Sequence, residues 1–384
     1  MNIFKKLLVL ILYLFIQACH PSTSKQATVL PISTTPFATK DIQTSQTSTP
    51  VYLSSPTPSY SLSPLPFLSE DLNTIGSSNI SSLVKLIEFQ SQNSYAISIH
   101  WSTNSKQIHI LRSDGAIEIW DTQKGNLVKV FEPAKKNSNG VGWYPTKNLV
   151  AYSDRITNEI SVWDLTNNRY LFDLGINTFP FITAQLVTWS ADNSKIVSGG
   201  WDNTLRVWDA SSGDELKVIQ SDSPWFESVA WAPSEDLIAV GHKDGLVYVI
   251  NTSNWKTINT LFGPNSGHEG GAPVVSWSPD GTKIASGGRD EAKAFVWNSS
   301  GAQLYQLNNQ PLSVFGLGWS ADSKMIATSG EGWDVVITDS STGSELFRIG
   351  DHKPNTYCVA WSPDGKLLAT STSEGKIRIW GIRP

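Results

Sequence analysis

The sequence predicts an all-β fold, a propeller of seven four-stranded antiparallel blades, and three observations lead to it. A segment recurs seven times, and each copy has a tryptophan at the end of an apolar run. These landmarks are spaced by 42 or 46 residues and are Trp101, Trp143, Trp189, Trp231, Trp277, Trp319 and Trp361. Each copy also contains several short strand-like runs separated by turn sequences. A period in the low forties with short strands is typical of propellers.

The strand order within one repeat follows from its apolar pattern. The first runs, such as "CVAWSP" and "VVSWSP", are apolar and end in a turn, which suits a strand buried near the propeller axis. A second apolar run follows, for example "KIASGG" or "KLLATS". The third, such as "TLRVWD" or "KIRIW", alternates apolar and polar residues as a half-buried strand does. A fourth, such as "NLVKVF", completes the blade.

Ring closure is predicted to use a strand from the N-terminal side of the repeats. The seventh copy stops after its third strand, so the seven repeats hold six fourth strands. The segment "SLVKLIEF", Ser82 to Phe89, closely resembles "NLVKVF". We therefore expect it to complete the last blade, which removes an open sheet edge that would favour aggregation.

A second landmark identifies the repeat type. Trp120-Asp121, Trp163-Asp164 and Trp208-Asp209 close the third strands, with Trp297-Asn298 and Trp380-Gly381 as variants. Together with the seven copies, these pairs make the chain similar to the WD-repeat (Trp-Asp) family over residues 80–384. The resemblance implies a non-catalytic propeller that serves as a scaffold for a protein or peptide partner.

The N-terminus is predicted to be a targeting segment. Lys5 and Lys6 precede ten apolar residues, Leu7 to Ile16, which as a helix rise only ~15 Å and fall short of a ~30 Å hydrocarbon core. Residues 1–18 are therefore predicted to be a signal peptide. The segment from Ile16 to Cys19 resembles a bacterial lipobox, which predicts lipidation of Cys19 and an extracytoplasmic lipoprotein anchored to the membrane of a bacterial envelope. An ordinary signal peptide with an incidental cysteine, or an uncleaved anchor, are the alternatives.

Residues 19–79 are predicted to be a disordered linker between this anchor and the propeller. From Pro21 to Glu70, 28 of 50 residues are Ser, Thr or Pro and four are charged. Such a stretch buries too little apolar surface to offset its ordering entropy.

Composition excludes several classes of function. The net charge is −5 without a Lys or Arg cluster, which argues against nucleic acid as a partner. Two cysteines and six scattered histidines supply neither a disulfide framework nor a metal site. The loop "GPNSGHEGG" lacks the Lys-Ser/Thr of a phosphate-binding loop. We therefore expect no metal and no cofactor, and we expect a monomer.

Three repeats carry residues that invite a catalytic interpretation. A His, a Ser or Thr, an acidic residue and a Trp recur at similar spacings, and Ser, His and Asp together suggest a hydrolase. In the WD-repeat family such residues form a hydrogen-bonded structural tetrad, and the repetition with Thr in place of Ser favours this reading. The residues are His268, Ser286, Asp290 and Trp297; His352, Thr370, Glu374 and Trp380; and Ser198, Asp202 and Trp208, where Pro180 holds the histidine position.

Large side chains are predicted to gather on one propeller face. They lie in loops that precede first strands, or in turns between second and third strands, where no turn requires them. Trp, Tyr and Arg most often carry interface energy, so we expect a partner-binding face formed by Tyr95, Phe179, Phe181, Trp201, Trp225, Phe226, Arg289 and Trp333. The alternative for these aromatic residues is that each folds onto its own loop. Two alternatives remain for the function of the protein: a propeller that binds or hydrolyses a small molecule, and a Tol-like periplasmic component of an envelope complex.

Overall fold

The computed structural model describes most of the chain from residue 72 onward. The described ranges are 72–91, 94–132, 138–144, 148–154, 159–176, 186–200, 202–221, 225–233, 236–261, 268, 270–272, 274–289, 292–307, 310–332, 334–350, 352 and 355–384. They belong to one compact unit, Ser61–Pro384. Within these ranges no helix has the length and hydropathy needed to cross a membrane. The predicted signal peptide, Cys19 and residues 20–71 of the predicted linker lie outside them.

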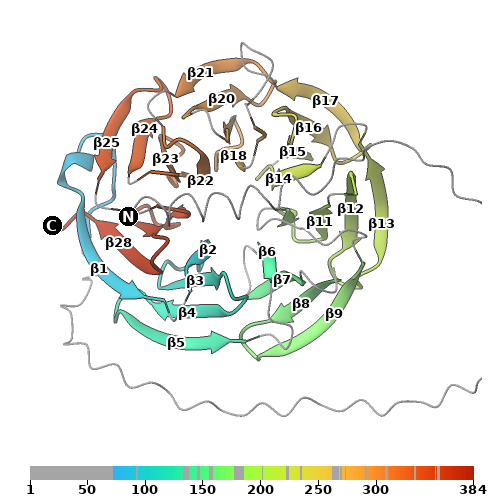
Figure 1. The fold of residues 1–384 in the computed structure, drawn as a ribbon, viewed down its shortest axis with the longest axis horizontal. Helices are drawn as coiled ribbons and strands as arrows, with labels where there is room; N and C mark the ends of the chain where they lie inside the picture. The colour runs from blue at the N-terminus through green and yellow to red at the C-terminus, as the bar shows by residue number, and fades with distance from the viewer. Residues whose placement is uncertain are drawn as a thin grey trace, which may run out of the picture. The chain divides into compact units, whose positions relative to one another are not determined.

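Seven four-stranded antiparallel sheets form a ring, which confirms the predicted propeller (Figure 1). The first, innermost strands are β2 (Ala96–Trp101), β6 (Ser138–Trp143), β10 (Val187–Trp189), β14 (Phe226–Trp231), β18 (Val274–Trp277), β22 (Val314–Trp319) and β26 (Val359–Trp361). The second strands are β3 (Gln107–Arg112), β7 (Leu149–Asp154), β11 (Lys195–Gly199), β15 (Leu237–His242), β19 (Lys283–Gly287), β23 (Met325–Gly330) and β27 (Leu367–Ser371).

The two outer strands of each blade follow in chain order. The third strands are β4 (Ile117–Asp121), β8 (Glu159–Asp164), β12 (Thr204–Asp209), β16 (Val247–Asn251), β20 (Ala294–Asn298), β24 (Val335–Asp339) and β28 (Lys376–Gly381). The fourth strands are β5 (Asn126–Phe131), β9 (Arg169–Ile176), β13 (Glu215–Gln220), β17 (Lys256–Leu261), β21 (Gln303–Leu307), β25 (Glu345–Ile349) and, for the last blade, β1 (Val84–Gln90). We number the blades one to seven from β2 to β26.

The predicted closure is confirmed, because β1 pairs antiparallel with β28 and completes blade seven. The pairing runs from Val84 opposite Gly381 to Gln90 opposite Lys376. On the buried side of β1, Ile87 and Phe89 are 4% and 3% exposed. The Phe89 ring stacks on Trp120 of blade one with centroids 4.3 Å apart, so the closing strand also joins blade seven to blade one.

The packed chain begins before β1. Leu72 and Ile75 are buried, and the Ile75 N–H donates to the Gly365 carbonyl at 2.9 Å. A short 3-10 helix, η1 (Ile80–Ser82), buries Ile80 in the same core cluster as residues of blades six and seven. The folded region therefore includes residues 72–79, which the sequence assigned to the linker.

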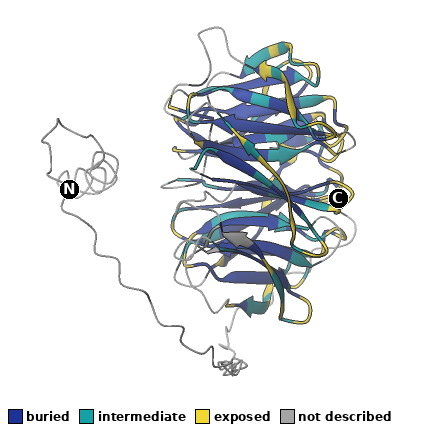
Figure 2. Cartoon of the chain, turned by 90° about the vertical axis from the view of Figure 1, so that its right-hand side faces the viewer, coloured by how far each residue is buried: buried dark blue, intermediate teal, exposed yellow. Residues whose placement is uncertain are grey.

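Buried side chains fill the blades and the spaces between them, whereas most exposed residues lie in loops and on the outermost strands (Figure 2). The first-strand tryptophan of one blade reaches the blade before it. Trp101 Nε1 donates to the Ala360 carbonyl at 2.9 Å, and Trp189 Nε1 donates to the Gly142 carbonyl at 2.9 Å. Trp319 Nε1 makes the same contact with the Ser276 carbonyl at 3.3 Å. These tryptophans therefore join neighbouring blades by packing and by hydrogen bonds.

Candidate binding face

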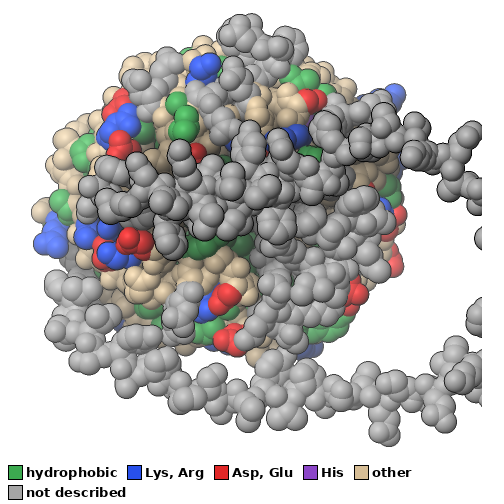
Figure 3. All heavy atoms as spheres, in the orientation of Figure 1, with side chains coloured by type: hydrophobic (Ala, Val, Ile, Leu, Met, Phe, Trp, Pro, Cys, Tyr) green, Lys and Arg blue, Asp and Glu red, His purple; other side chains and the backbone are tan. Residues whose placement is uncertain are grey.

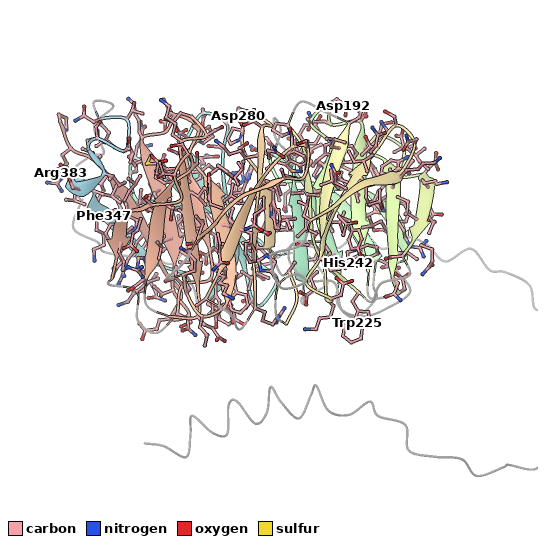
Figure 4. The ribbon with its side chains drawn as sticks, turned by 90° about the horizontal axis from the view of Figure 1, so that it is seen from above. Asp192, Trp225, His242, Asp280, Phe347 and Arg383 are labelled. Carbon is pink, nitrogen blue, oxygen red and sulfur yellow. The ribbon has the colours of Figure 1, made fainter. Side chains whose placement is uncertain are left out.

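The propeller has two faces with different construction. One, the loop face, is made by the segments that precede each first strand and by the turns between second and third strands. The other, the turn face, is made by the turns between first and second strands and between third and fourth strands. Trp225 lies on the loop face, and Asp192 and Asp280 lie on the turn face at the opposite side of the ring (Figure 4).

Side chains on the loop face form a continuous series across five blades. The Tyr95 ring lies 5.2 Å from the Tyr357 ring, which lies 6.3 Å from the Phe315 ring. The Arg289 guanidinium carbon lies 6.0 Å from the Phe315 ring centroid, within cation–π range. Arg289 Nη2 is 3.2 Å from Glu227 Oε1. We call these five residues, together with Lys243, the loop-face cluster.

The repeat explains why the cluster is continuous. Glu227, Phe315 and Tyr357 each lie four residues before the first-strand tryptophan of their blade. First strands of neighbouring blades lie side by side around the axis (Figure 1). Equivalent positions in successive blades are therefore neighbours in space. Sequence reasoning included Tyr95 and Arg289 but missed these three, although their shared repeat position was a signal that could have found them.

Glu227 is the buried charge of the cluster. It is 7% exposed, and Lys243 Nζ lies 3.7 Å from its Oε1 in addition to Arg289. Burial raises the pKa of Glu227, while the charges of Arg289 and Lys243 act in the opposite direction. Gly271, with φ +115°, makes the close approach possible because a Cβ there would lie 2.2 Å from Glu227 Oε2. The carboxylate is thus held in place by two cations that are themselves partly exposed.

Exposed apolar side chains extend the cluster. Trp225 is 40% exposed and Leu312 is 54% exposed. Trp225 has a left-handed backbone conformation, with φ +33°, and its N–H donates to Asn203 Oδ1 at 2.9 Å. In the space-filling view of this face, hydrophobic, acidic and basic side chains lie next to one another (Figure 3). Such a mixed surface around aromatic rings and an arginine has the composition of a protein-binding site.

One residue of the predicted face does not reach the surface. Phe226 is 1% exposed, and its ring packs edge-on against His242 with centroids 4.4 Å apart. As the first residue of β14 it faces inward, whereas its neighbour Trp225 lies outside the strand. The expectation for Phe226 is corrected accordingly. Four other residues of the predicted face lie outside the described ranges: Phe179, Phe181, Trp201 and Trp333.

The residues that suggested a hydrolase form buried hydrogen-bonded chains. His268 Nε2 lies 2.8 Å from Ser286 Oγ, and Trp297 Nε1 donates to the same oxygen at 3.2 Å. Ser286 is 0% exposed, which leaves its hydroxyl no access to a substrate. The fourth predicted member, Asp290, lies outside the described ranges.

The same chain recurs in blade seven and in part in blade three. His352 Nε2 lies 2.7 Å from Thr370 Oγ1, to which Trp380 Nε1 donates at 2.9 Å. In blade three Trp208 Nε1 donates to Ser198 Oγ at 2.9 Å.

The two acidic members within the described residues make contacts of their own. The Glu374 side chain is 56% exposed and lies 3.9 Å from Lys376 Nζ, so its place in the tetrad stays a prediction. In blade three Asp202 lies 3.4 Å from Arg206 Nη2 and accepts a hydrogen bond from Thr204 Oγ1 at 2.7 Å. An arginine thus stands beside the aspartate in a blade whose histidine position holds proline.

Two blades replace the pattern by other chemistry that sequence reasoning missed. In blade six Thr328 Oγ1 hydrogen-bonds Gln310 Oε1, and the glutamine precedes the hydroxyl residue by 18 positions, as His268 precedes Ser286. In blade one Trp120 Nε1 donates to Glu118 Oε2 at 2.9 Å. Glu118 is 0% exposed, and its Oε1 lies 3.1 Å from Arg112 Nη1. In blade one the indole N–H thus donates to a carboxylate of a buried ion pair, whereas in blades three, five and seven it donates to a buried hydroxyl.

Ser286→Ala is expected to lower stability without affecting any chemistry. The substitution leaves the Trp297 indole N–H and the His268 ring without their shared partner, and an unsatisfied buried polar group costs about 1–3 kcal/mol. Thermal unfolding of the variant checks the loss. Ser300→Ala, on the exposed turn after β20, is the matched control and should melt as the unmodified protein does. A hydrolase activity that Ser286→Ala abolishes at unchanged melting temperature would contradict this interpretation.

Within the described residues, no group of three or more His, Cys, Asp or Glu side chains is arranged to hold a metal ion.

Two family comparisons match the repeats. Residues 183–209 and 343–381 match the family described as "WD domain, G-beta repeat", and residues 229–311 match "Anaphase-promoting complex subunit 4 WD40 domain".

Curated relatives are similar over about half of the chain. Protein tipD of Dictyostelium discoideum is 25% identical over 215 residues, which are 53% of this chain and 33% of that protein. Autophagy-related protein 16 of Arabidopsis thaliana is 26% identical over 50% of this chain and 36% of its own length. The U5 small nuclear ribonucleoprotein 40 kDa protein of Dictyostelium discoideum is 25% identical over 54% of this chain and 59% of its own length. The chain thus spans less than two thirds of the length of each of these relatives.

Proposed function

Because this chain is a seven-bladed β-propeller of the WD40-repeat family, we propose that it is a non-catalytic platform whose loop face binds a protein or peptide partner. The observation that carries the proposal is the loop-face cluster, in which side chains of five blades are joined by ring contacts and ion pairs. WD40 propellers commonly act as scaffolds for protein partners, which supports the same reading.

The chemistry of the cluster suits a polypeptide. Tyr95 and Trp225 are each 40% exposed and offer rigid aromatic surface at a low cost in side-chain entropy. Arg289 and Lys243, whose side chains are 35% and 37% exposed, flank the buried Glu227 carboxylate and remain partly accessible to a partner. Aromatic anchors beside a polar, charged rim are the composition of interface hot spots.

Site-directed photo-crosslinking tests where a partner docks. A photoreactive amino acid placed at Tyr95 or Trp225 in the full chain should give a discrete adduct with a protein of the source cell. The same probe at Asp192, on the turn face, is the matched control and should give none. Equal labelling at all three positions, or labelling at Asp192 alone, would contradict a partner on the loop face.

Truncation of the central anchors is expected to weaken capture of that partner. Trp225→Ala and Phe315→Ala should each cost ~2 kcal/mol or more of binding free energy if they are hot spots. Trp225 lies outside the strands, so its substitution should leave the melting temperature nearly unchanged. Isothermal titration calorimetry with the partner identified by crosslinking measures the loss of binding free energy. Leu216→Ala on β13, which changes an exposed outer-strand residue, is the control and should bind as the unmodified chain does.

We also propose that the propeller is displayed from a bacterial cell envelope on a lipid attached to Cys19. The proposal rests on the sequence from Ile16 to Cys19 and on the short apolar run before it. Labelled palmitate should be incorporated by the unmodified chain and not by Cys19→Ser, as judged by autoradiography. Equal labelling of both would remove the lipobox interpretation while leaving the partner proposal untouched.

A further inference from the structure

One pair of positions distinguishes blade one from the six other blades. In every blade the residue before the first-strand tryptophan lies opposite a residue of the second strand. In six blades both members are no larger than valine or threonine: Gly142 and Ala151, Thr188 and Val197, Ala230 and Ala239, Ser276 and Ala285, Gly318 and Ala327, and Ala360 and Ala369. In blade one the pair is His100 and His109. Two imidazoles thus stand where the propeller otherwise places small side chains.

The imidazoles change the contact between blades one and two. At three other blade junctions the first-strand indole donates to the carbonyl of the small residue in the preceding blade. Trp143 of blade two instead lies parallel to the His100 ring, with centroids 5.5 Å apart and planes 7° apart. Its Nε1 donates to Ser98 Oγ at 3.2 Å. The junction is therefore built around a stacked imidazole and indole.

A cavity of about 460 Å³ lies at this junction. It is lined by His100, His109, Trp143 and Tyr144, and by polar residues of the adjoining turns such as Asn104 and Asn148. These turns join first and second strands, so the cavity lies at the turn face, away from the loop-face cluster. Its volume falls within the range of about 300–1,000 Å³ that small-molecule sites occupy.

His109 lies in the wall of this cavity with its Nε2 enclosed. The residue is 3% exposed, and its Nε2 has no hydrogen-bond partner among the described residues. Burial lowers the pKa of His109 to about 4, and burial together with the nearby His109 lowers that of His100 to about 3. Both rings are therefore neutral at pH 7, and each offers one donor and one acceptor nitrogen.

The lining chemistry selects the class of ligand. The described residues of the lining include neither lysine nor arginine, and their one carboxylate, Asp164, accepts hydrogen bonds from the backbone of Thr166 and Asn167. An anionic ligand would therefore meet a negative charge without a compensating cation. Amides, hydroxyls and neutral imidazoles both donate and accept hydrogen bonds, and the aromatic rings offer an apolar surface. This combination matches a compact ligand with several hydroxyl groups and one apolar face.

We propose that the cavity between blades one and two binds a small neutral saccharide, enclosed by the paired imidazoles of His100 and His109 and by the amides of the adjoining turns. Trp143 and Tyr144 supply the aromatic surface, and amides of the surrounding turns bind the remaining hydroxyls. The site is separate from the loop face, so the propeller carries two independent recognition surfaces.

Titration of the full chain with methyl glucoside, methyl galactoside, methyl mannoside and N-acetylglucosamine tests this, with glucose 6-phosphate as the anionic counterpart. At least one neutral sugar should bind saturably at millimolar concentrations or below, as followed by calorimetry. His109→Ala should weaken that sugar by roughly tenfold or more, since it removes an imidazole from the cavity wall and substitutes the residue that five other blades carry. His242→Ala, which removes a buried histidine of blade four, should bind the sugar as the unmodified chain does.

A measurement on the unmodified chain keeps the test independent of folding. The imidazole nitrogen resonances of His109 and the indole resonance of Trp143 should shift on sugar binding, while those of His242 stay in place. Absence of saturable binding by every neutral sugar, or equal binding of glucose 6-phosphate, would overturn the proposal. So would unchanged affinity in a folded His109→Ala variant.

Discussion

Removal of residues 1–90 is expected to destabilise the propeller more than any single substitution does. The deletion takes away β1, which leaves blade seven with three strands and uncovers the edge of β28. It also removes Ile87 and Phe89, and the burial of two such side chains contributes about 3–6 kcal/mol. The uncovered edge presents unpaired backbone groups and favours self-association. Thermal unfolding and size-exclusion chromatography should show a much lower melting temperature and soluble aggregates.

Two matched controls separate strand pairing from mere shortening. A chain that begins at residue 72 keeps β1 and should melt close to the full chain. Within β1, Phe89→Ala should cost about 3–5 kcal/mol, because its ring stacks on Trp120, whereas Val84→Ala alters a side chain that is 41% exposed and should cost far less. An unchanged melting temperature after deletion of residues 1–90 would show that β1 does not hold the ring closed.

Arg112→Met is expected to cost about 3–5 kcal/mol, the range found when one member of a buried ion pair is removed. Glu118 is 0% exposed, and its Oε1 lies 3.1 Å from Arg112 Nη1 while its Oε2 accepts the Trp120 indole. Methionine keeps much of the apolar stem but removes the Arg112 charge from the buried carboxylate. Chemical denaturation of the variant measures the loss as a lower midpoint at unchanged slope.

A surface pair provides the comparison. Lys324 Nζ lies 3.8 Å from Asp322, with side chains 75% and 46% exposed. Exposed pairs of this kind are worth about 0–1 kcal/mol, so Lys324→Met should be nearly neutral. If Arg112→Met proved equally neutral, the Arg112–Glu118 pair would contribute no more than a surface contact, and blade one would rest on its apolar packing alone.

The propeller and its closing strand could be predicted from the sequence because both depend on repetition. Each copy repeats the same apolar pattern, and "SLVKLIEF" could be recognised as a displaced fourth strand by its likeness to the others. The hydroxyl positions of Ser286 and Thr370 repeat in the same way. The period of the repeat and the residues in its turns are therefore sufficient to predict the seven-bladed ring.

The residues of the loop face could not all be predicted, because their exposure depends on details that the repeat pattern does not show. Trp225 and Phe226 are adjacent in sequence, yet one is 40% and the other 1% exposed, because the strand begins between them. Phe315 and Tyr357 lie inside or beside first strands whose pattern predicts core, yet both are only half-buried and their rings meet on the loop face. Glu118 could not be predicted as the partner of Trp120, since the buried cation beside it comes from another strand.

The pairing of β1 with β28 also has a consequence for the order of events during synthesis. β1 is translated first and its partner last, and residues 91–375 are made in between. At roughly 5–20 residues per second, a ribosome needs about 15–60 s for that stretch. Throughout this time the nascent chain holds Ile87 and Phe89 without the strand that buries them. Blades one to six can fold as they emerge, but the ring closes only when β28 has left the ribosome. Ribosome-bound intermediates are thus incomplete rings with two open ends. A chaperone that covers an apolar strand has the longest time to bind at β1, because β1 waits longest for its partner strand.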